Sequence, residues 1–196
     1  FNLGMANGDR RSWSAIGWMK LKGYGCKQNY KQAFQYYKKA YAMGDDTVYA
    51  GLGHMYQQGS GCRKNLKRAI TIFREGAKRG IAECYYNLAL FYDHGIHLKR
   101  SPSKATKMLV EASKRNSSHA MLALGARHFT GYNVPKNIQT AVRLFKKAAL
   151  GNNAISVEPE LYRFYAKLLN DSKNSTDIKQ VIALLERAAN KGDGRA

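Results

Sequence analysis

The sequence has few acidic residues, few cysteines and no long apolar run, and each shortage narrows what the chain can be. No apolar stretch approaches the roughly 20 residues that a membrane-spanning helix needs, so we expect no membrane span. The three cysteines are an odd number, which argues against a disulfide framework. No cysteine pair has the spacing of a zinc site, and the histidines do not cluster with the cysteines. We therefore expect no metal and no cofactor.

The shortage of acid leaves a large positive charge. Lysine and arginine number 33 against 13 aspartate and glutamate residues, which gives a net charge of +20. No acidic residue occurs from Arg10 to Gly44, or from Ala112 to Val157. A field of this kind attracts polyanions, which in a cell are nucleic acid, an anionic membrane or an acidic protein surface.

The motifs of a catalytic site are also missing. The sequence contains neither a Gly-rich phosphate loop nor a His-Glu-x-x-His helix. His94 and His97 flank a turn but have no third partner that would complete a metal site. Cys62 has Arg63 and Lys64 beside it, which would lower the pKa of its thiol, but no companion histidine is evident. We therefore expect no enzyme and no catalytic residue.

What the chain does contain is a repeat with a fixed step of 36 residues. Three columns of like residues carry it: Gly23, Gly59, Gly95 and Gly131; Ala33, Ala69, Ala105 and Ala141; and Ile16, Leu52, Leu88 and Leu124. A period between about 20 and 50 residues indicates stacked structural repeats. Such arrays usually present an extended binding surface.

Each repeat divides into two expected helices, A and B, separated by joints that contain glycine. The A helices are expected at residues 12–22, 47–58, 82–94 and 118–130, and the B helices at residues 30–43, 66–79, 103–115 and 138–150. One A-helix column holds only glycine or alanine: Gly17, Gly53, Ala89 and Gly125. Because small residues permit close approach, we expect helix B of the same repeat to cross there.

After residue 151 the register changes. Helices expected at residues 158–169 and 177–190 form a fifth, stretched unit that would cover the open end of the array. The domain prediction is therefore four repeats over residues 1–152, followed by a degenerate fifth repeat or C-terminal cap over residues 153–196.

The cysteines fit this arrangement as free thiols. Cys26 and Cys62 occupy equivalent positions one repeat apart. Packed helices lie about 8–10 Å apart, whereas a disulfide needs Cα atoms within about 7 Å. We expect a reducing compartment, such as the cytoplasm or the mitochondrial matrix.

These columns resemble the Sel-one-like repeat family, a branch of the tetratricopeptide-like superhelical proteins. The second repeat shows the family pattern most fully: Leu52-Gly53, Tyr56, Gly59-Ser60-Gly61, Ala69, Phe73, Ala77 and Gly80. The resemblance covers residues 10–152 closely and residues 158–193 loosely. It implies an all-α fold, a right-handed α/α superhelical solenoid of about four to five antiparallel helix pairs. It also implies an adaptor or scaffold rather than an enzyme.

In such superhelices the A helices line the concave face, which singles out apolar A-helix columns outside the family pattern. One column holds large side chains and is the predicted partner-binding row: Trp13, Tyr49, Tyr85 and Met121. A less uniform column holds Trp18, His54, Leu90 and Ala126. Aromatic rows suit an extended peptide or a partner helix. The alternative interpretation is that these side chains fill the core between helices.

A second candidate surface is a row of cations at the A–B joints. Its residues recur one repeat apart: Lys27, Arg63 and Lys99, with Lys64, Arg100 and Lys136 beside them. Neighbouring repeats would set these cations about 10 Å apart, near one Debye length at physiological salt, so that their fields partly add. The row would bind an acidic partner or a phosphate backbone. The alternative is a solvated loop edge.

The sequence therefore predicts a non-catalytic protein–protein interaction module that binds an acidic surface or segment of another protein in its groove. One alternative is a basic component of a ribonucleoprotein, such as an organellar ribosome, with RNA as the partner. Another is an immunity-type partner of a bacterial toxin, since the family includes such proteins.

Overall fold

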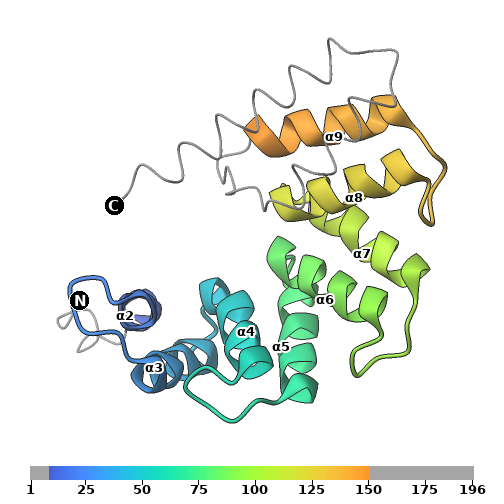
Figure 1. Cartoon of the computed structure of the whole chain (residues 1–196). Helices are drawn as coiled ribbons and strands as arrows, with labels where there is room; N and C mark the ends of the chain where they lie inside the picture. The colour runs from blue at the N-terminus through green and yellow to red at the C-terminus, as the bar shows by residue number, and fades with distance from the viewer. Residues whose placement is uncertain (1–8, 151–196) are drawn as a thin grey trace. The chain divides into compact units, whose positions relative to one another are not determined.

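A computed structural model describes residues 9–150, and every regular element in that range is a helix (Figure 1). The elements are α2 (Arg10–Lys22), α3 (Tyr30–Ala42), the short 3₁₀ helix η1 (Asp46–Val48), α4 (Tyr49–Gln58), α5 (Leu66–Lys78), α6 (Ala82–His94), α7 (Pro102–Lys114), α8 (Ser118–Thr130) and α9 (Ile138–Leu150). The all-α prediction is confirmed, and the helix boundaries agree with the expected ones to within two residues. The helices expected after residue 151 lie outside the described residues.

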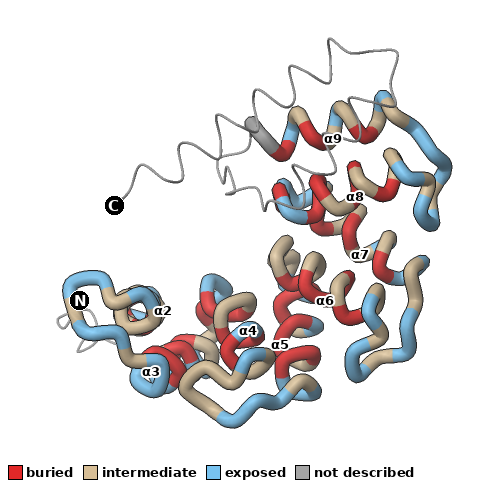
Figure 2. The backbone as a smooth tube through the Cα atoms, viewed as in Figure 1, coloured by how far each residue is buried: buried red, intermediate tan, exposed pale blue. Residues whose placement is uncertain are grey.

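The chain divides into two compact units, Phe1–Ser101 and Pro102–Ala196. In the first unit α2 packs on α3, α4 packs on α5, and α5 also packs on α6. In the second unit α8 packs against both α7 and α9. Buried positions gather where helices of one unit face each other, as the red segments of Figure 2 show. Within each unit the core is therefore the contact between paired helices.

Glycines in the A helices make these contacts possible. A Cβ atom added to Gly17 would lie 2.4 Å from Cδ1 of Tyr37, and one added to Gly53 would lie 2.3 Å from Cε1 of Phe73. Both rings come from helix B of the same repeat. In the second unit Gly125 stands in the same relation to Phe145. The expected close crossing at this column is confirmed in these three repeats.

The joints keep one backbone conformation although their residues change. Each A helix ends at a left-handed glycine, and Gly23, for example, donates its N–H to the carbonyl of Met19 at 2.7 Å. Two residues further on, φ is also positive in all four joints: Gly25 (65°), Gly61 (74°), His97 (55°) and Asn133 (57°). Because two side-chain-bearing residues adopt this conformation, the packing of the joint determines it, and glycine lowers its conformational cost.

Candidate partner-binding site

The aromatic row predicted from the sequence lies mainly between helices. The ring of Trp13 stands 5.8 Å from the ring of Tyr36, and the ammonium group of Lys39 lies 3.6 Å above it. Tyr49 is only 5% exposed and its ring packs 5.0 Å from that of Tyr41. Both side chains thus contact the adjacent B helix, α3.

The other two members of the row differ in exposure. Tyr85 on α6 is partly exposed, whereas Met121 on α8, in the second unit, is 2% exposed. Tyr49 and Met121 therefore offer a partner almost no surface, while Trp13 and Tyr85 keep part of theirs. A role of this row in binding stays a prediction.

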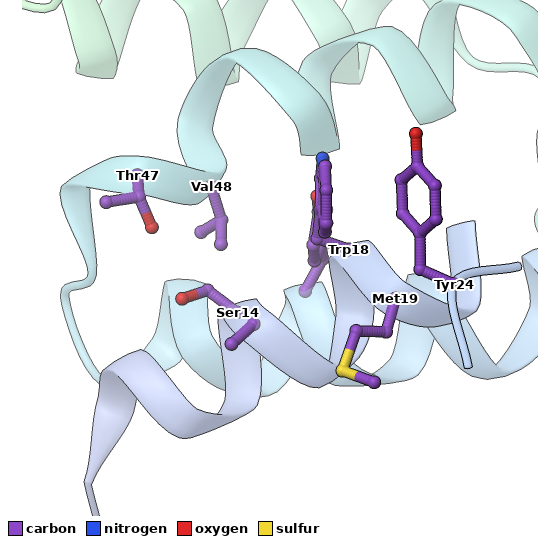
Figure 3. Close-up of a pocket in the computed structure, with 8 residues that line it drawn as sticks. Ser14, Trp18, Met19, Tyr24, Thr47 and Val48 are labelled. Atoms are coloured by element: carbon purple, nitrogen blue, oxygen red, sulfur yellow. The ribbon is translucent and has the colours of Figure 1, made fainter. Parts of the chain in front are cut away.

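The other tryptophan of α2 is the one that faces solvent. Trp18 is 48% exposed, and Tyr24, in the joint that follows α2, is 56% exposed. Their rings lie 4.9 Å apart, within the range of favourable aromatic pairing. Figure 3 shows both rings projecting on the same side of the first unit. Large aromatic surface left open to water in this way is typical of a contact site.

Trp18 and Tyr24 form part of the wall of a cavity of about 650 Å³. Its lining comes from α2, the following joint, α3 and η1: Ser14, Ala15, Trp18, Met19, Tyr24, Tyr37, Thr47 and Val48 (Figure 3). Tyr37 and Val48 are 6% and 1% exposed, so packing in the core fixes this part of the wall. The volume falls within the range of ordinary ligand pockets.

The hydroxyls of Ser14 and Thr47 in the cavity wall are already used within the chain. The hydroxyl of Ser14 donates to the carbonyl of Arg11 at 2.9 Å. The hydroxyl of Thr47 donates to Oδ1 of Asp45 at 2.7 Å, and the backbone N–H of Thr47 donates to the same oxygen. The cavity therefore offers a ligand mostly apolar contacts, which suit an apolar side chain of a partner protein better than a polar metabolite.

Asp45 anchors the η1 side of this cavity. Its carboxylate is buried, and burial alone would raise the pKa of Asp45. Hydrogen bonds to the carboxylate, foremost those donated by Thr47, and the positive charge of Arg10 outweigh that effect, so the pKa lies below its usual value and the group is a carboxylate at neutral pH. The charged carboxylate in turn holds the N-terminus of η1, and with it Val48, in place.

The cations predicted at the joints are all exposed: Lys27, Arg63, Lys64, Lys99, Arg100 and Lys136. Five of them belong to the first unit, and Lys136 belongs to the second. Arg100 donates its Nε–H to the carbonyl of Asp93 at 2.9 Å. Among the described residues, Lys27, Arg63 and Lys64 form no ion pair, so their charge is available to a partner.

The cysteines do not form a reactive site. All three thiols are free, as expected. The Sγ of Cys62 points to the carbonyl of Met55 at 3.5 Å, and Cys26 makes the equivalent contact with Met19 at 3.8 Å. Burial raises the pKa of the Cys62 thiol. The sequence-based expectation that Arg63 and Lys64 would lower it is wrong, because desolvation of the thiol dominates.

Native labelling with iodoacetamide should modify Cys26 and Cys62 well before Cys84. Cys84 is fully buried, and burial, together with nearby Glu83, raises its pKa to about 12. Relative to the ordinary value of 9.0, this lowers the thiolate fraction at neutral pH by about a thousandfold. Timed labelling followed by peptide mass spectrometry measures the order. In urea the three rates should converge, and rapid native labelling of Cys84 would contradict its placement in the core.

No three His, Cys, Asp or Glu side chains among residues 9–150 come together in a way that could hold a metal ion. Within the same residues, no helix combines the length and the apolarity that crossing a membrane requires.

Paired helices that cross at a small residue, repeated every 36 residues, define a helical repeat protein. The sequence profile of the Sel1 repeat matches residues 14–45, 48–81, 82–117, 118–153 and 176–193. The chain belongs to the Sel1 repeat family, whose repeats generally serve as non-catalytic modules for protein interaction.

Solved structures show the same fold. A Sel1 repeat protein from Oxalobacter formigenes aligns with a TM-score of 0.75 at 24% identity, over 93% of this chain and 73% of its own. A protective antigen with an SLR fold, present in uropathogenic Escherichia coli strains, aligns with a TM-score of 0.71 at 21% identity. That alignment covers 93% of this chain and 39% of the antigen. No curated protein sequence matches the chain significantly.

Proposed function

We propose that the chain is an adaptor or scaffold that holds an acidic segment of a partner protein, with one apolar side chain of that segment in the cavity of the first unit. The observation that carries the proposal is the exposed Trp18–Tyr24 pair beside a mostly apolar cavity of about 650 Å³. A large side chain seated between such rings is the usual centre of a binding hot spot.

The charge around the cavity supports an acidic partner. Helix α2 carries Arg10, Arg11, Lys20 and Lys22, and neither α2 nor α3 contains an acidic residue. The joint cations Lys27, Arg63, Lys64, Lys99 and Arg100 belong to the same unit. These charges would steer an acidic segment to the cavity and speed its association.

A random peptide library displayed on phage tests the proposal. Selection on the native protein should enrich peptides that combine acidic residues with a large apolar side chain. Replacing Trp18 with alanine should weaken the selected peptides by about 2 kcal/mol, or roughly thirtyfold. The matched control is Tyr132→Ala, which removes a 44% exposed aromatic side chain from the second unit and should leave affinity unchanged.

Two outcomes would count against the proposal. If the peptides bound wild type and Trp18→Ala equally well, the cavity would not be the binding site. If their affinity stayed the same in about 0.5 M NaCl, the partner would not be recognised by its acidic charge, because charge attraction is strongly screened there. Alanine at Trp13 and Tyr85 in the same assay would show whether the predicted row adds contacts beyond the cavity.

The net charge of +20 favours a second candidate, a basic component of a ribonucleoprotein that binds RNA. A gel-shift titration with generic single- and double-stranded RNA at low salt tests it. The absence of any retarded band would end this candidate and leave the first intact.

A further inference from the structure

Positive charge in the first unit lies on α2 and on the B helices α3 and α5. The B helices α3 and α5 share an exposed cationic stripe, which we call the basic face: Lys31, Lys38, Lys67, Arg74 and Lys78. In contrast, α4 contains no lysine, arginine, aspartate or glutamate, and α6 contains only the acidic residues Glu83 and Asp93. The basic face is thus a feature of the B helices, and the cavity wall is formed mostly by α2 and η1.

The stripe has a regular geometry. Lys31 and Lys38 lie seven residues apart on α3, and Lys67 and Arg74 occupy the same two positions on α5, one repeat later. Residues at this spacing share one side of a helix, about 10 Å apart along its axis. That is close to three nucleotide steps along one strand of a duplex, at about 3.4 Å each.

Direct contacts hold α3 and α5 beside each other. The hydroxyl of Tyr41 on α3 donates a hydrogen bond to the carboxylate of Glu75 on α5. Gly61, in the joint before α5, lies directly against the backbone carbonyl of Tyr30 at the start of α3. Equivalent positions on the two helices therefore lie on one continuous face.

The cations of the basic face have no counter-ions among the described residues. Glu75 is the only acidic residue of α3 and α5, and it accepts the hydrogen bond from Tyr41. The Lys38 ammonium lies 5.8 Å from the ring of Phe34, and no ion pair involves any of the five side chains within residues 9–150. Uncompensated like charges repel one another, and a polyanion would relieve that repulsion.

We propose that the basic face binds the phosphate backbone of double-stranded nucleic acid without reading its sequence. Single-strand binders add aromatic platforms on which bases stack, but Phe34 and Tyr37 of α3 are buried, at 7% and 6% exposure. Tyr30, next to Lys31, is the one large exposed aromatic at this face in the described residues. Stable attachment to a membrane surface would need a second, apolar signal.

The proposal narrows the second candidate function and is independent of the cavity. Its test measures binding of a short mixed-sequence DNA duplex, an RNA duplex and a single strand by fluorescence anisotropy across a salt series. The face variant is Lys31→Gln/Lys38→Gln/Lys67→Gln/Arg74→Gln. The matched control is Arg10→Gln/Arg11→Gln/Lys20→Gln/Lys22→Gln, which removes the same charge from α2, and circular dichroism verifies that both variants fold.

Wild type should bind duplex more tightly than single strand. For the DNA duplex, the face variant should flatten the slope of log K against log salt by about 3.6, because each lost phosphate contact contributes about 0.9. The α2 variant should change this slope less. Equal effects of the two variants would show that net charge alone acts, and would overturn the proposal. So would tighter binding to single strand, or binding to phosphatidylserine vesicles without binding to duplex.

Trp18→Ala separates this proposal from the first. It should bind duplex like wild type while losing the selected peptides, and the face variant should keep those peptides. Loss of duplex binding by Trp18→Ala would instead place the nucleic acid at the cavity and overturn the assignment to the B helices.

Discussion

Alanine at Gly61 is expected to destabilise the first unit by about 3 kcal/mol or more. Its Cβ atom would lie 2.0 Å from the carbonyl oxygen and 2.4 Å from the carbonyl carbon of Tyr30. Both are backbone atoms, so no rotamer change can relieve the clash, and the joint must move away from α3. The positive φ of 74° adds about 1–2 kcal/mol for any residue with a side chain. Urea unfolding followed by tryptophan fluorescence, which reports on α2 in this unit, measures the loss.

Gly25→Ala is the matched control, one repeat earlier. Its φ is also positive, at 65°, but the nearest atom to an added Cβ is the terminal methyl carbon of Met19, at 3.7 Å. The stability of this variant should therefore fall only by the conformational cost of a positive φ, about 1–2 kcal/mol. If both variants lost the same amount of unfolding free energy, the close contact between the joint and Tyr30 would have no effect on stability.

Truncating Phe73 to alanine is expected to cost about 3–5 kcal/mol, the usual range for a buried phenylalanine. Its side chain is fully buried. The ring lies over Gly53, 6.1 Å from the ring of Phe91 and 5.6 Å from that of His54. Its loss would open a cavity between helices that glycine, having no side chain, cannot help to fill. Unfolding in urea again gives the change in free energy.

A double-mutant cycle identifies the partner of this ring. Where the first two repeats and the fourth have glycine with an aromatic residue, the third has Ala89 and Leu109 at the corresponding positions. Gly53→Ala and Phe73→Leu should each destabilise the unit, one by crowding and the other by leaving space. The double variant should lose less stability than the sum of the two single losses, and the difference should be about 0.5–3 kcal/mol.

The same coupling is expected in the second unit for Gly125→Ala with Phe145→Leu, which have the equivalent contact. Simple additivity in both units would mean that the ring and the glycine do not depend on each other's size.

The sequence predicted the local features of this fold well. Helix boundaries follow from apolar spacing and from the glycines of the joints. Gly23, Gly59, Gly95 and Gly131 indeed end their helices in the left-handed conformation. The close crossing at Gly53 was predictable because four repeats sample the same position and keep it small. Repetition served here as an internal comparison.

The candidate site was harder to predict because it depends on which helix covers which side chain. Trp13 and Trp18 both lie on α2, five residues apart, and nothing local distinguishes them. The sequence nevertheless contains one signal that distinguishes the two tryptophans. The column of Trp13 stays large in every repeat, as core positions do, whereas the column of Trp18 changes to histidine, leucine and alanine, as surface positions do. Tyr24 lies in a joint, outside any helical pattern, and only the folded chain brings it beside Trp18.

The contact between Gly61 and Tyr30 also gives a reason for the spacing of 36 residues between the first two repeats. Because this joint rests on the backbone of the preceding repeat, an inserted or deleted residue there would disturb two repeats at once. Related sequences should therefore differ in length by whole repeats, because insertions or deletions within residues 59–65 would destabilise the fold and be removed by selection. Epitope tags or fluorescent labels should accordingly be inserted elsewhere in the chain.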